Sequence, residues 1–212
     1  MMPLDVECIN GLKDNKESAM KILLFCCKGF EMMEFAPFVD VMGWARTDYN
    51  LDVEVVTSGF TEIVNSAFNV PINVDVVLDN INVDDYDALA IPGGFEEYGF
   101  YEEAYDERFL ELIREFNRRG KYIASICVGA LPIGASGVLT GRRGTTYHFR
   151  NGQRQNQLAE FGVDVQRDER IVIDGNVMTS FCPETAPDVA FQLLRWMVGE
   201  DQTEVIKHVM GY

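Results

Sequence analysis

The chain has 212 residues and a globular composition, and this length allows one sizeable hydrophobic core without metals or disulfides. It carries 18 basic and 34 acidic side chains, so its net charge of −16 argues against nucleic acid or an anionic membrane as the main partner. The five cysteines form no Cys-x-x-Cys pair and the chain has only two histidines, which excludes a zinc ribbon or finger. We expect a cytoplasmic protein with free thiols, because the N-terminus lacks the basic region and long apolar run of a secretory signal.

The order of apolar and polar segments predicts a single domain. Residues 1–20 are polar with weak periodicity, and we expect them to form an N-terminal extension to a domain over residues 21–212. In chain order, the predicted elements are a strand at 22–26, a helix at 31–46, a strand at 51–57, short strands at 62–65 and 71–77, a strand at 88–91, a helix at 102–120, a strand at 121–126, a helix at 128–136, a hairpin of 169–173 and 177–181, and helices at 185–198 and 203–210.

Strands that alternate with helices over the whole length indicate an α/β sandwich. In this architecture a mostly parallel sheet is covered by helices on both faces. Ligands of such folds bind beyond the carboxyl ends of the strands. The residues that directly follow the predicted strands are therefore the first candidates for a functional site.

Cys127 lies between a predicted strand and a predicted helix, and the small residues Gly129 and Ala130 follow it. This is the arrangement of a nucleophile elbow, in which a tight turn pushes one side chain out beyond the end of a strand. Because the N-terminus of the following helix favours the thiolate, we expect a lowered pKa and a raised reactivity for Cys127. The remaining cysteines within the domain are expected to pack as small apolar side chains: Cys26, Cys27 and Cys182.

Two other segments follow predicted strands. The N–H groups of Gly93 and Gly94 could stabilise a negative charge beside the elbow, although the two glycines are equally well explained as a plain turn. A protonated carboxyl of Glu31 or Glu34 could donate a hydrogen bond to the thiol sulfur. From their spacing alone, solvated charges in the first turn of a helix are the favoured explanation for both glutamates.

Four motifs in a fixed order resemble the ThiJ/PfpI superfamily, the group that contains the parkinsonism-associated deglycase and bacterial proteins labelled thiazole monophosphate biosynthesis enzyme. The motifs are KGFEMME at Lys28–Glu34, VDVM at Val39–Met42, IPGG at Ile91–Gly94 and ASICVGA at Ala124–Ala130. The resemblance extends from about residue 21 to about residue 198. It implies a flavodoxin-like three-layer sandwich, related to that of class I glutamine amidotransferases, and a homodimer that needs no cofactor.

The resemblance also implies roles for single residues. Cys127 is expected to be the reactive cysteine, and Glu34 the protonated acid that hydrogen-bonds its sulfur, whereas Glu31 stays a solvated charge. The cysteine of such proteins oxidises readily to a sulfinic acid. The residues implied to line an anion pocket are Gly93, Gly94 and, through its N–H, Val128.

The chain departs from related branches at three places. Val128 stands where the peptidase branch has a histidine, and residues 181–184 lack the late histidine of glutamine amidotransferases, so neither activity is expected. Many relatives have Thr-Thr-His after the elbow, whereas this chain has Thr-Thr-Tyr-His at residues 145–148. Either His148 reaches the site as a third candidate catalytic residue, or Tyr147 takes its place.

These residues leave two functions open. In the first, the protein is a glyoxalase-, deglycase- or hydratase-like enzyme in which Cys127 adds to a small-molecule electrophile. In the second, it is a non-enzymatic redox sensor or stress-protective protein that responds through oxidation of Cys127. Both depend on the same activated thiol, and turnover would distinguish them.

Overall fold

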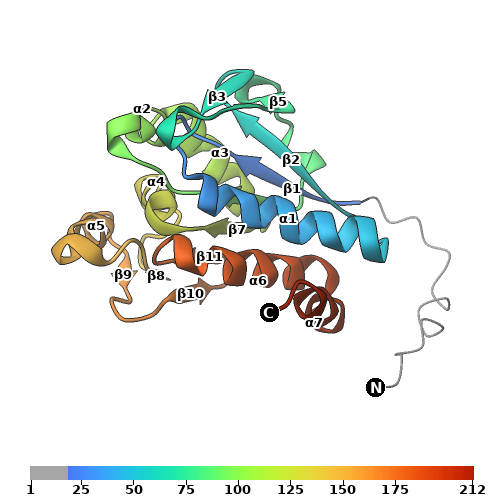
Figure 1. Ribbon diagram of the computed structural model, residues 1–212. Helices are drawn as coiled ribbons and strands as arrows, with labels where there is room; N and C mark the ends of the chain where they lie inside the picture. The colour runs from blue at the N-terminus through green and yellow to red at the C-terminus, as the bar shows by residue number, and fades with distance from the viewer. Residues whose placement is uncertain (1–18) are drawn as a thin grey trace.

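The computed structural model describes residues 19–212, in which a seven-stranded sheet lies between two layers of helices (Figure 1). The strands of this sheet are β1 (Met20–Phe25), β2 (Val53–Gly59), β5 (Val76–Val77), β6 (Ala88–Ile91), β7 (Tyr122–Ser125), β10 (Ile171–Asp174) and β11 (Val177–Ser180). The helices are α1 (Met32–Tyr49), α2 (Phe100–Ala104), α3 (Glu107–Arg118), α4 (Ala130–Ala135), α5 (Phe149–Glu160), α6 (Ala186–Val198) and α7 (Glu200–Val209). Two small pairs lie outside the main sheet: β3 (Ile63–Asn65) with β4 (Pro71–Asn73), and β8 (Arg143–Gly144) with β9 (Asp164–Val165).

The strands of the main sheet are ordered β10-β11-β7-β6-β1-β2-β5, and only the β10–β11 pair is antiparallel. Helices α1, α6 and α7 pack together on one face, and α3 and α4 cover the other (Figure 1). The central strands are buried from both sides, which explains the continuous apolar run in β1. The predicted flavodoxin-like sandwich with a mostly parallel sheet is therefore confirmed.

The strand order determines which loops meet. Strands β7, β6 and β1 are adjacent and parallel, so the residues that follow them lie at the same edge of the sheet. The segments that directly follow these strands contain Cys127, Gly93 and, in the first turn of α1, Glu34, which are far apart in the sequence. The loop after β1 is also tied directly to the loop after β6, because the Glu31 N–H donates to the Gly93 carbonyl at 2.9 Å.

The predicted elements differ from the structure in several places. The single helix expected at 102–120 is two helices, because the Asp106 side chain accepts from the Arg108 N–H at 2.9 Å and caps a new helix start. The predicted strand at 71–77 is divided between β4 and β5. Helix α5 has no predicted counterpart, since its residues are polar and its first turn is left-handed.

Most of the predicted extension at residues 1–20 lies outside the described residues. Of its last two residues, Met20 already belongs to β1 and pairs with Val53. Within residues 19–212, no helix is both long enough and apolar enough to cross a membrane.

Candidate active site

Cys127 lies in a tight turn between β7 and α4. Its φ of 54° is in the left-handed region that non-glycine residues rarely adopt. The turn is held by the Thr146 hydroxyl, which donates to the Cys127 carbonyl at 2.7 Å. The backbone of this segment passes so close to the end of β6 that a Cβ on Gly129 would lie 2.6 Å from the Ile91 carbonyl oxygen. A strained, glycine-dependent turn of this kind is the geometry expected of a nucleophile elbow.

Replacing Gly129 with alanine should therefore destabilise the protein by about 2 kcal/mol, because the new methyl group meets backbone atoms that have no room to move. Gly43 provides the matched control, since it lies exposed in α1 with no atom within 4 Å of an added Cβ. Gly43→Ala should stabilise the protein by roughly 0.5–1 kcal/mol through its higher helix propensity. Urea denaturation of both variants measures the difference, and equal unfolding midpoints would contradict the close approach at Gly129.

Glu34 is completely buried in the first turn of α1. Its Oε2 accepts from the Gly93 N–H at 2.5 Å, and its Oε1 has no hydrogen-bond partner among the described residues. Burial and, second, the negative charge of Glu31 raise the pKa of Glu34 to about 8, so the acid is protonated at neutral pH. Because Oε2 acts as an acceptor, the acidic proton belongs on Oε1. The solvated charge favoured from spacing alone is thus wrong for Glu34.

Cys127 is buried, with only 7% of the residue exposed. Burial raises the pKa of Cys127 well above its ordinary value, the Glu34 carboxyl opposes ionisation of the thiol as well, and the Val128 N–H acts in the opposite direction. The helix N-terminus was expected to lower the pKa of Cys127. Burial of the thiol outweighs that effect, so the predicted direction of the shift is wrong. Thiol and acid therefore form a neutral pair at neutral pH, in which each group influences the pKa of the other.

Of the three residues expected to line an anion pocket, Gly94 and Val128 lie at the cavity and Gly93 does not. Gly93 does not line the cavity at Cys127, and its N–H is occupied by Glu34. A Cβ on Gly93 would lie 2.9 Å from Glu34 Oε2 and 2.9 Å from the Val128 nitrogen, so glycine is required for Glu34 to reach this N–H. Gly94 and Val128 do line the cavity beside Cys127. This arrangement favours a role for Gly93 in positioning the Glu34 carboxyl, whereas Gly94 and Val128 are the residues that can contact a ligand.

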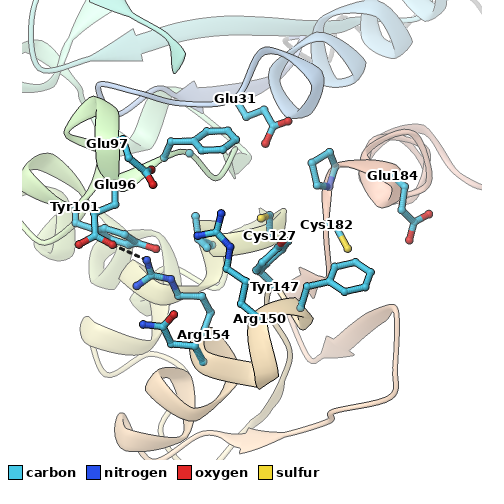
Figure 2. Close-up of a pocket in the computed structure, with 16 residues that line it drawn as sticks. Glu31, Glu96, Glu97, Tyr101, Cys127, Tyr147, Arg150, Arg154, Cys182 and Glu184 are labelled. Atoms are coloured by element: carbon cyan, nitrogen blue, oxygen red, sulfur yellow. Dashed lines mark hydrogen bonds and ion pairs between the residues drawn. The ribbon is translucent and has the colours of Figure 1, made fainter. Parts of the chain in front are cut away.

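The cavity next to Cys127 has a volume of about 360 Å³ (Figure 2). Tyr147 lines it, whereas His148 lies behind Cys182, with Nδ1 3.5 Å from the Cys182 sulfur and the ring stacked on Phe181 at 4.1 Å. Of the two open alternatives, the structure thus places Tyr147, and not His148, at the cavity. Among residues 19–212, no cluster of three or more His, Cys, Asp or Glu side chains could hold a metal ion.

Comparison with known proteins agrees with this geometry. The family model described as "DJ-1/PfpI family" matches residues 20–196. The chain belongs to the DJ-1/PfpI family. The resemblance predicted from the four motifs is thereby confirmed.

Known proteins that are similar to this chain match it over different lengths. Deglycase PfpI of Pyrococcus furiosus is 32% identical over 164 residues, which are 77% of this chain and 91% of that protein. Isonitrile hydratase of Pseudomonas putida is 32% identical over 129 residues, which are 59% of this chain and 52% of the hydratase. The crystal structure of Drosophila melanogaster DJ-1beta superposes with a TM-score of 0.79 at 25% identity and covers 91% of this chain and 97% of that one.

Several cavity residues of this family member were not expected from its sequence. Cys182 is buried, as expected of a small apolar side chain, but it also lines the same cavity as Cys127, and burial raises its pKa to about 11. Tyr101, Arg150 and Arg154 also line the cavity (Figure 2). The Asn-Gly pair after Arg150 is a turn signal in the sequence, but it does not show that the turn faces Cys127.

Proposed function

We propose that the protein is a cofactor-free enzyme that converts small α-oxoaldehydes to 2-hydroxy acids through a covalent adduct on Cys127. The observation that carries this proposal is the neutral acid–thiol pair, in which the buried Glu34 is protonated and its Oε1 has no hydrogen-bond partner among residues 19–212. A carboxylic acid of this kind can give and take protons at the carbon and oxygen atoms of an adduct on the neighbouring sulfur. The relatives named deglycase and isonitrile hydratase support an enzymatic role.

The first step is addition of the thiol to the aldehyde. The Cys127 sulfur forms a bond to the aldehyde carbon, the C=O π electrons move to the oxygen, and the thiol proton is relayed to that oxygen through Glu34. The product is a hemithioacetal. Gly94 and Val128 line the cavity beside Cys127, so their N–H groups are the candidates to stabilise the negative charge that develops on this oxygen.

The later steps rearrange the adduct and release it. The carbon bound to sulfur loses its C–H proton and its hydroxyl loses the O–H proton, while the neighbouring ketone carbon and the ketone oxygen each gain one proton, with Glu34 as the proton shuttle. The product is a thioester of the 2-hydroxy acid. Water then attacks the thioester carbon, the C–S bond breaks, and the thiol is restored. One molecule of water is consumed overall, and the isomerisation is internal to the substrate, so no oxidant or reductant is required.

Conversion of methylglyoxal to lactate tests this proposal. The wild-type protein should consume the aldehyde and release stoichiometric lactate, and Cys127→Ala should lower kcat/KM on the order of a thousandfold or more, since the nucleophile is removed. Cys26→Ala is the matched control, because it deletes a buried thiol outside the cavity and should leave turnover unchanged. Full activity of Cys127→Ala would contradict the proposal. Slow oxidation of Cys127 without lactate would also contradict it, and would favour a redox sensor.

A further inference from the structure

Among the cavity residues that have no part in the proposed reaction are Tyr101, Arg150 and Arg154. In the view of Figure 2, Tyr101 and Arg154 lie together on one side of the cavity, and the Arg150 guanidinium lies between them and Cys127. A molecule that fills this cavity would touch the sulfur as well as this polar side. The three side chains are therefore placed to bind the part of a substrate that does not react.

The Tyr101 hydroxyl is buried and has no hydrogen-bond partner among residues 19–212. Its ring is fixed by its neighbours, since Tyr105 stacks on it at 5.5 Å and the Arg154 guanidinium covers it at 4.7 Å from the ring centre. Folded proteins rarely bury a hydroxyl without a partner, because the lost hydrogen bond to water is not replaced. A bound molecule with an acceptor atom in the cavity would supply the missing partner.

The two arginines differ in their availability. Arg154 is neutralised by Glu96, with Nη2 2.7 Å from the carboxylate. Arg150 forms no hydrogen bond or ion pair with any residue in the described part of the chain, although it lines the cavity. One cationic group is thus free to pair with a ligand.

The acidic side chains at the cavity do not occupy Arg150. Glu184 is paired with Arg170 at 2.7 Å, and burial raises the pKa of Glu31. Glu97 is exposed to solvent at the rim of the cavity. Glu97 therefore adds a negative charge at the rim, and the single free guanidinium is best matched by a ligand with a single negative charge.

The backbone at Arg150 is unusual for its residue type. Arg150, Asn151 and Gly152 have φ values of 55°, 59° and 69°, so three consecutive residues are left-handed. Asn and Gly tolerate this region, but Arg rarely adopts it. Conformations of this kind persist where the surrounding structure enforces them, and they cluster at ligand-binding positions.

We infer that Arg150 and the Tyr101 hydroxyl form a carboxylate subsite. The preferred substrates are then α-oxoaldehydes with a carboxylate at the end opposite the aldehyde. The guanidinium of Arg150 offers two parallel N–H groups to the two carboxylate oxygens, and Tyr101 donates a third hydrogen bond. The substrate class rests on the proposed function, whereas the subsite itself depends only on the geometry of the cavity.

The first test compares 4,5-dioxopentanoate with its methyl ester, in which the terminal carboxylate is replaced by an uncharged group. The wild-type protein should prefer the carboxylate by about tenfold in kcat/KM, mainly through KM, because a charged hydrogen-bonded pair typically contributes this much. Arg150→Gln should remove the preference, Arg150→Lys should keep part of it, and Tyr101→Phe should reduce it about threefold. Arg167→Gln is the matched control, since Arg167 binds Asn156 at 2.8 Å and does not line the cavity.

The second test needs no turnover. It measures alkylation of Cys127 by iodoacetate and by iodoacetamide, with peptide mass spectrometry to separate Cys127 from Cys182. The rate ratio of iodoacetate to iodoacetamide should fall about tenfold in Arg150→Gln and should stay at the wild-type value in Arg167→Gln.

The two tests separate the subsite from the reaction. A changed alkylation ratio without turnover of either aldehyde would overturn the proposed function and support the subsite. Turnover with an unchanged ratio and no preference between acid and ester would overturn the subsite alone.

Discussion

Replacing Glu34 with glutamine is expected to lower kcat/KM for methylglyoxal by about a hundredfold or more, because an amide accepts the Gly93 N–H but transfers no proton. The wild-type rate should fall as the pH rises through about 8, where Glu34 loses the proton that it supplies. This alkaline limb should be absent in Glu34→Gln. The measurement is a pH–rate profile of both proteins between pH 5 and pH 10.

Glu31→Gln is the comparison that isolates Glu34. The negative charge of Glu31 raises the pKa of Glu34, so its removal should move the alkaline limb of the profile to lower pH without abolishing turnover. Equal losses of activity in Glu31→Gln and Glu34→Gln, with unchanged pH limbs, would rule out a special role of Glu34 as the proton donor.

The same Glu34→Gln substitution is expected to stabilise the fold at alkaline pH. The pKa of Glu34 is about 8 in the folded protein and 4.5 in the unfolded chain, so between these values the folded state holds a proton that the unfolded state has released. The stability that this group contributes is therefore complete below pH 4.5 and is lost as the pH rises to about 8. The loss is about 1.4 kcal/mol for each pH unit and roughly 5 kcal/mol at most.

Glutamine has no such proton, so the stability gain of Glu34→Gln should be small near pH 5 and should grow steadily toward pH 8. Urea denaturation at a series of pH values measures this gain. Asp40→Asn, on the exposed side of the same helix, serves as the control and should leave the pH dependence of stability as in the wild-type protein. A Glu34→Gln variant that is less stable than wild type at pH 8 would contradict the raised pKa of Glu34 in the folded protein.

Local patterns in the sequence were sufficient for the central elements of the fold. The apolar run of β1 and the short run of β6 predict buried parallel strands, because no other regular element of that length buries both faces. The boundary between α2 and α3 was missed because it depends on one capping side chain, Asp106, inside an otherwise helical pattern. Helix α5 was missed because its residues show little apolar periodicity, so its position depends on tertiary contacts.

The site was only partly predictable for a related reason. Cys127 and Gly94 each follow a strand, so their position at one edge of the sheet follows from the architecture alone. The role of Glu34 could be assigned only from the family resemblance, since its spacing alone favours a solvated charge. The direction of the Cys127 pKa was predicted wrongly because burial depends on the whole fold. Tyr101 and Arg150 come from segments whose sequence patterns do not indicate which way their side chains face.

The order of β7, β6 and β1 in the sheet also has a kinetic consequence. The hydrogen bond from Gly93 to Glu34 joins groups 59 residues apart, and the elbow follows a third strand further along the chain. Contacts of such long sequence separation form late during folding, because the entropy of closing the intervening loops must first be overcome. In a partly folded chain, Cys127 and Glu34 are therefore both present but not yet in contact, and the chemistry of the pair arises only when the parallel sheet is complete.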